Sequence, residues 1–156
     1  MKALVVFYSR TGTTRKIADD IAKALRCKTE EIFDTKNRSG VLGWLSSGRE
    51  GMGEKLTKLV EPKKDPSKYD LVVIGTPIWA GKMSVPVRTY LGLKKDGFKK
   101  VAFFYTAGGN YDSSVSADVE KTCGKSPVAT LGLSSAEIKK GGSTEKIKEF
   151  LEKLNG

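Results

Sequence analysis

The sequence predicts an α/β fold: a doubly wound, five-stranded parallel sheet in the order 2-1-3-4-5, with helices on both faces. Short apolar runs alternate with amphipathic segments, which is typical of strand–helix–strand units joined by right-handed crossovers. Residues 71–74 and 101–105 are unbroken apolar runs, as expected of strands that are covered on both faces. With 156 residues, we expect a single domain over residues 1–156.

The first half of the chain begins with a strand and a helix. An apolar run predicts a strand over residues 3–8, and apolar residues at helical spacing predict a helix over residues 13–26. A short second strand is expected at residues 29–33. Residues 34–69 are rich in glycine and charge, and we expect a helix in this stretch that covers the sheet. The alternative for residues 34–69 is a lid or a partner surface.

The second half continues the alternation of strands and helices. Three further apolar runs predict the third, fourth and fifth strands, at residues 71–74, 101–105 and 128–133. Three amphipathic segments predict helices, at residues 85–91, 113–122 and 144–154.

Composition limits the classes of function. The net charge of +10 fits an anionic ligand, an acidic partner or a basic surface, and without a basic and aromatic groove pattern we expect no nucleic-acid partner. No apolar run has membrane-spanning length and no signal peptide is recognisable, so we expect a cytoplasmic protein without membrane insertion. Cys27 and Cys123 are expected to be free thiols. Because the chain has no histidine, chemistry carried by a bound cofactor is favoured over a metal site or an acid–base pair.

The first segment, residues 9–14, is the most informative stretch. It joins the first strand to the first helix and consists of Ser9, Arg10, Thr11, Gly12, Thr13 and Thr14. A helix N-terminus offers unpaired N–H groups and partial positive charge, hydroxyl groups add donors, and glycine lets the backbone curve around an anion. The segment therefore predicts a phosphate site, with ordinary helix capping as the alternative.

Two further segments follow the third and fourth strands. The second segment, residues 75–82, contains Thr76, Pro77, Ile78, Trp79, Ala80 and Gly81, and the third, residues 106–112, contains Thr106, Ala107, Gly108, Gly109 and Tyr111. In the expected strand order all three segments converge on one crevice at the carboxyl ends of neighbouring strands. We expect Trp79 to be exposed and to stack on a ring, with a core position as the alternative. Together the segments predict a site for a planar, phosphorylated ligand.

The chain resembles the flavodoxin family over essentially its full length. The first segment resembles the family's loop for the 5′-phosphate of FMN, and the second resembles the loop whose aromatic residue packs on the isoalloxazine. The third lacks the family's usual Gly-Asp-x-x-Tyr pattern. The resemblance implies that FMN is the cofactor and that the residues of the three segments named above bind it.

The resemblance also implies a function, an FMN-binding electron-transfer protein that serves redox partner proteins. An FMN-dependent reductase of quinones or another small electron acceptor is the alternative, and a flavin-free interaction domain is a third. In the family a peptide beside a glycine changes orientation with the redox state of the flavin, and Gly81 is the candidate here. Lys82 either faces the ring, where it would stabilise negative charge, or extends into solvent.

Overall fold

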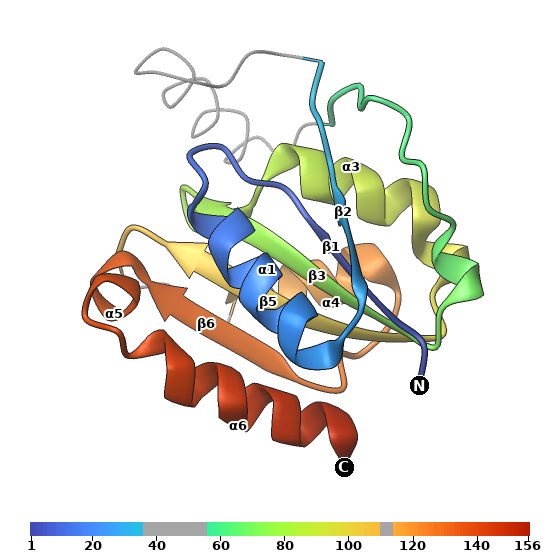
Figure 1. Ribbon diagram of the computed structural model, residues 1–156. Helices are drawn as coiled ribbons and strands as arrows, with labels where there is room; N and C mark the ends of the chain where they lie inside the picture. The colour runs from blue at the N-terminus through green and yellow to red at the C-terminus, as the bar shows by residue number, and fades with distance from the viewer. Residues whose placement is uncertain (36–55, 110–113) are drawn as a thin grey trace.

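The computed structural model describes residues 1–35, 56–109 and 114–156. Five parallel strands form the main sheet in the order β2-β1-β3-β5-β6, which confirms the predicted doubly wound topology (Figure 1). A short sixth strand, β4, pairs antiparallel with β3. The strands are β1 (Ala3–Phe7), β2 (Lys28–Glu31), β3 (Leu71–Trp79), β4 (Lys82–Met83), β5 (Lys100–Ala107) and β6 (Thr130–Ser134).

Helices cover both faces of the sheet. Ile17 of α1 and Phe150 of α6 belong to one hydrophobic cluster, while Val87 of α3 and Val115 of α4 belong to the other. No helix in the described part of the chain is long and apolar enough to cross a membrane. The helices are α1 (Thr13–Leu25), α3 (Val85–Lys94), α4 (Ser114–Cys123), α5 (Ser135–Lys139) and α6 (Ser143–Asn155), with 3-10 turns at Pro66–Lys68 and Lys95–Gly97.

Strand β3 is longer than predicted and ends in a hairpin. Residues 75–79, expected to be part of a loop, continue the strand, and Trp79 pairs with Lys82 of β4. Ala80 and Gly81 connect the two strands with φ angles of +50° and +76°. Positive φ at both central residues is typical of a tight hairpin turn. β5 likewise extends through Thr106 and Ala107, past its predicted end at residue 105.

A glycine in β3 allows close packing at the centre of the sheet. Gly75 lies opposite Phe104 of β5 in the parallel register. A Cβ atom at Gly75 would lie 2.0 Å from Cζ of Phe104, closer than any real contact. The aromatic ring therefore occupies the space that a side chain at position 75 would need.

The helix expected within residues 34–69 lies largely outside the described residues, which resume at residue 56. The described flanks of this stretch pair with each other: Asp34 forms a bridge with Leu59, and Val60 N–H donates to the Phe33 carbonyl at 2.8 Å. The only helical turn in the described parts of this stretch is Pro66–Lys68. The returning chain thus runs along the outer edge of the sheet beside β2.

Both cysteines are free thiols, as predicted. Cys123 is buried at the end of α4, and burial raises the pKa of its thiol to about 11. Burial also raises the pKa of the Cys27 thiol.

Candidate functional site

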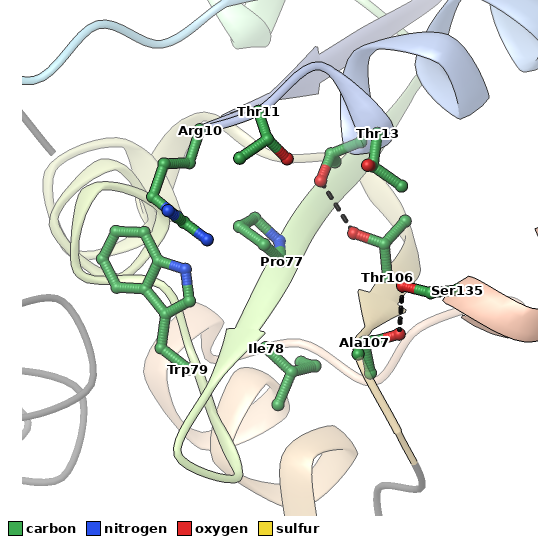
Figure 2. A pocket seen from close by; sticks show the side chains of 11 residues that line it. Arg10, Thr11, Thr13, Pro77, Ile78, Trp79, Thr106, Ala107 and Ser135 are labelled. Atoms are coloured by element: carbon green, nitrogen blue, oxygen red, sulfur yellow. Dashed lines mark hydrogen bonds between the residues drawn. The ribbon is translucent and has the colours of Figure 1, made fainter. Parts of the chain in front are cut away.

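A pocket of about 180 Å³ lies at the carboxyl ends of β1, β3 and β5, where the first, second and third segments meet (Figure 2). A residue of α5 completes its wall. The pocket is lined by Arg10, Thr11, Thr13, Thr14, Pro77, Ile78, Trp79, Thr106, Ala107, Gly108 and Ser135. The parallel strand order brings these segments together, because neighbouring parallel strands end at the same edge of the sheet.

The first segment folds as a tight turn into α1. Gly12, with φ +97°, precedes the helix, and its N–H donates to Oγ of Ser9 at 3.0 Å. The first turn of α1 contains no acidic residue, and no side chain caps it. Its N–H groups and partial positive charge are therefore directed toward the site, as an anion would require.

Two buried threonines join the first and third segments. The hydroxyl oxygens of Thr14, in the first turn of α1, and Thr106, near the end of β5, lie 2.7 Å apart. Both residues line the pocket, and both are almost fully buried. This hydrogen bond holds the start of α1 against β5, so the hydroxyl-rich wall has a defined shape.

The second segment supplies an apolar wall. Trp79 is only 6% exposed, so the expectation of an exposed tryptophan is wrong. The extension of β3 places its indole edge-on against Tyr8, with ring centroids 5.6 Å apart and planes at 89°. Trp79 still lines the pocket, together with Pro77 and Ile78. It therefore presents part of its indole as a fixed wall.

Several predicted binding residues do not line the pocket. The Thr76 hydroxyl lies 2.9 Å from both Oγ and N of Ser84, so it joins β3 to the start of α3. Lys82 lies in β4 and also is not part of the lining. Tyr111 lies outside the described residues. The other predicted residues that are absent from the lining are Ser9, Gly12, Ala80, Gly81 and Gly109.

Ser135 lines the pocket although the sequence reasoning did not select it. It is the first residue of α5, and its hydroxyl donates to the carbonyl oxygen of Ala107 at 3.2 Å (Figure 2). The pattern Ser134-x-x-Glu137 directly after an apolar run could have identified this helix start, because it forms a capping box.

The capping box also ties α5 to α6. Glu137 N–H donates to Oγ of Ser134 at 3.2 Å, and Ser134 N–H donates to Oε2 of Glu137 at 2.8 Å. The Lys146 ammonium group donates to the same carboxylate. The hydrogen bond from Lys146 and that from Ser134 N–H lower the pKa of Glu137 to about 2. Ser135 is therefore held at the pocket by a charged network behind it.

The lining has one kind of charge. Among the described lining residues Arg10 is the only charged one, and none of them carries a carboxylate, an imidazole or a thiol. Hydroxyl groups from α1, β5 and α5 occur together with the apolar side chains of β3. The arrangement suits a flat ligand with an anionic end, and it offers no acid–base pair among the lining residues.

Comparisons with known proteins agree with this geometry. The sequence matches a family model described as Flavodoxin over residues 2–154. No curated protein matches the sequence significantly.

Several solved structures share the fold. A flavoprotein from Lactobacillus acidophilus, solved in complex with FMN, is 23% identical, with a TM-score of 0.74 over 89% of this chain and 97% of that one. A candidate flavoprotein from Bacteroides uniformis is 24% identical, with a TM-score of 0.79 over 97% of each chain. A flavodoxin from the domain Archaea is 14% identical, with a TM-score of 0.56 over 100% of each chain.

Proposed function

The chain belongs to the flavodoxin family, and from this premise we propose that it binds FMN and transfers electrons between redox partner proteins. One observation carries the proposal: the pocket combines the uncapped start of α1, rich in hydroxyl groups, with an apolar wall from β3. FMN carries an anionic phosphate at one end and a flat isoalloxazine ring at the other. The L. acidophilus neighbour was solved with FMN, which supports the same cofactor.

The lining residues fit the two ends of FMN. Thr11, Thr13 and the N–H groups at the start of α1 would hold the phosphate, because the lining there carries donors and no competing carboxylate. Ile78 and Trp79 would lie against the ring system and exclude water. When bound, FMN supplies the electron transfer, while the protein binds and orients it.

The carrier role is favoured over a reductase by the lining. It contains no described group that could exchange a proton with a small acceptor at neutral pH. The net charge of +10 favours an acidic redox partner. The reductase of quinones or similar acceptors remains the second candidate, because Arg10 places positive charge in the pocket.

The remaining expectations belong to the same proposal. We propose a single domain over residues 1–156 that works in the cytoplasm. The two free thiols, Cys27 and Cys123, fit a reducing compartment. Neither nucleic acid nor a membrane is among the proposed partners.

Titration with FMN tests the cofactor. We expect the purified apoprotein to take up FMN and quench its fluorescence, and Thr13→Val to weaken FMN binding about tenfold or more. Riboflavin, which lacks the phosphate, should bind equally well to this variant and to the wild type. Thr144→Val, an exposed change on α6, is the matched control. Protein that takes up no FMN would contradict the proposal.

Steady-state assays separate the two functions. The reconstituted protein is mixed with NADH or NADPH and a quinone, and oxidation of the nicotinamide is followed. A carrier shows no steady-state turnover. Turnover that depends on bound FMN would instead establish the reductase.

A further inference from the structure

Arg10 brings a positive charge into the pocket, and no counter-ion for it is found among the described residues. Its side chain is partly buried and lines the pocket, whose described lining contains no acidic residue. Within the described parts of the chain, no ion pair or hydrogen bond of its side chain is found. Arg15 and Arg88, by contrast, hold Glu31 and Asp118 through two hydrogen bonds each.

An unpaired guanidinium in such a position indicates a ligand. Removing a charge from water is unfavourable unless a partner of opposite charge replaces the lost hydration. Arg88, whose side chain is 8% exposed, shows how this chain meets that requirement at a buried position. At Arg10, which is partly buried, the described residues supply no such partner, and an anionic group on a ligand in the pocket would take that place.

The direction of Arg10 indicates which end of the ligand it meets. In Figure 2 its guanidinium points toward Trp79, whereas Thr13, Thr106 and Ser135 lie on the other side of the pocket. The hydroxyl groups suit a phosphate, and Trp79 belongs to the apolar wall that suits a ring. Arg10 therefore lies on the side of the ring, although the first segment to which it belongs suits the phosphate.

We propose that the Arg10 guanidinium stabilises the negative charge on the fully reduced ring of bound FMN and so raises the cofactor's two-electron potential. This inference rests on the proposed binding of FMN. The neutral oxidised ring takes up two electrons from a reductant and one proton from solvent, which leaves one negative charge on the ring. A cation in a partly buried pocket favours that charge because the interaction is only partly screened.

In this proposal Arg10, and not Lys82, is the residue that stabilises negative charge on the ring. Lys82 lies in β4 and outside the lining, whereas Arg10 is the only charged residue among the described ones that line the pocket. By thermodynamic linkage, a cofactor that binds more tightly in its reduced state than in its oxidised state has a higher reduction potential when bound. A raised two-electron potential favours the exchange of electron pairs, and it therefore supports the second candidate function, the reductase, over the carrier.

Charge variants test the assignment. For Arg10→Gln, Arg10→Met, Arg10→Lys and the control Lys82→Gln, one measures the Kd of oxidised FMN and of riboflavin. The two-electron midpoint potential follows from anaerobic titration with dithionite. We expect Arg10→Gln and Arg10→Met to weaken binding of reduced FMN about tenfold more than that of oxidised FMN. This corresponds to a fall in potential of about 30 mV. Arg10→Lys should retain most of the potential, and Lys82→Gln all of it.

Results that would overturn the role of Arg10 differ from the result that would overturn FMN binding. If Arg10→Gln weakens oxidised and reduced FMN equally, leaves riboflavin binding unchanged and does not shift the potential, Arg10 contacts the phosphate and the inference is wrong. It is also wrong if Lys82→Gln, and not Arg10→Gln, lowers the potential. Failure of the wild-type protein to bind FMN would remove the proposed function itself, and the inference with it.

Discussion

The hydroxyl groups of Thr14 and Thr106 lie 2.7 Å apart although 92 positions separate them in the sequence. Thr14 lies in the first turn of α1 and Thr106 near the end of β5, so their hydrogen bond connects the two walls that carry most of the pocket's hydroxyl groups. Both are buried, and each is the only partner found for the other's hydroxyl within the described residues. The bond therefore contributes to the stability of the fold and to the shape of the site.

Replacing either threonine by valine tests this link. Thr14→Val and Thr106→Val should each lower the free energy of unfolding by about 1 kcal/mol, because each leaves the other hydroxyl buried without a partner. The double variant should lose less than the sum, with a coupling of about 0.5–1.5 kcal/mol. Urea unfolding of the apoprotein measures all three. Strictly additive losses would show that the hydroxyls do not interact.

A methyl group at position 75 should destabilise the sheet. Gly75→Ala would place Cβ 2.0 Å from the Phe104 ring, and the resulting overpacking should cost about 1–3 kcal/mol in the free energy of unfolding. Gly92→Ala is the matched control: nothing lies within 4 Å of its added Cβ, and in helix α3 the change should stabilise by about 0.5–1 kcal/mol. Thermal or urea unfolding distinguishes the expected destabilisation by Gly75→Ala from the expected stabilisation by Gly92→Ala. A neutral Gly75→Ala would contradict the close packing.

The buried ion pair between α3 and α4 should be sensitive to loss of one partner. Nη2 of Arg88 lies 2.5 Å from Oδ2 of Asp118, and the two side chains are 8% and 11% exposed. Asp118→Ala should cost about 3–5 kcal/mol, because it leaves a buried guanidinium without its carboxylate. The double variant Arg88→Met/Asp118→Leu should recover most of this loss.

An exposed pair provides the control for that experiment. Lys16 and Asp20 pair on the surface of α1 at 3.2 Å, with side chains 64% and 47% exposed. Asp20→Ala should change the free energy of unfolding by no more than about 0.5 kcal/mol. Similar losses at Asp20 and Asp118 would show that burial does not determine the effect.

Stability should fall in acid through Glu137. Its pKa is lowered from 4.5 to about 2 by hydrogen bonds from Lys146 and Ser134, so the unfolded chain takes up a proton at this site first. The stabilisation is complete above pH 4.5 and is lost as the pH falls toward 2. Glu137→Gln should therefore reduce the slope of stability against pH in this range, measured by urea unfolding at several pH values. An unchanged slope would show that the network is absent in solution.

The fold was predictable because its signals are local. Alternating apolar runs and amphipathic segments indicated five strands in a parallel sheet, and the order 2-1-3-4-5 is one of the common doubly wound arrangements of such a sheet. Weaker local signals were missed: β4 has two residues, and α5 has five. The end of β3 was also misplaced, since Pro77 and Gly81 suggest a loop, whereas the hairpin that extends the strand depends on pairing with residues further along.

The location of the site was predictable from the sequence, but the side chains that line it were predicted less well. Strand order indicated that three segments meet, but it did not show which side chains face inward. The Thr76 hydroxyl turns to Ser84, and Trp79 packs on Tyr8, because tertiary neighbours offer better partners than solvent. Ser135 comes from a fourth segment, and its contact with Ala107 spans 28 positions, beyond the reach of a local pattern.

The position of Ser135 determines when, during synthesis of the chain, the pocket can be completed. The first segment is synthesised before β6 and α5, yet the pocket wall is complete only when β6 has paired with β5 and α5 has reached Ala107. Long-range parallel pairing forms late, because the entropy cost of closing a long loop must be met before the stabilising contacts form. Loading of a cofactor is therefore expected to follow the emergence of α5 from the ribosome, and a fragment that ends before residue 130 should carry the anion-binding turn without a closed pocket.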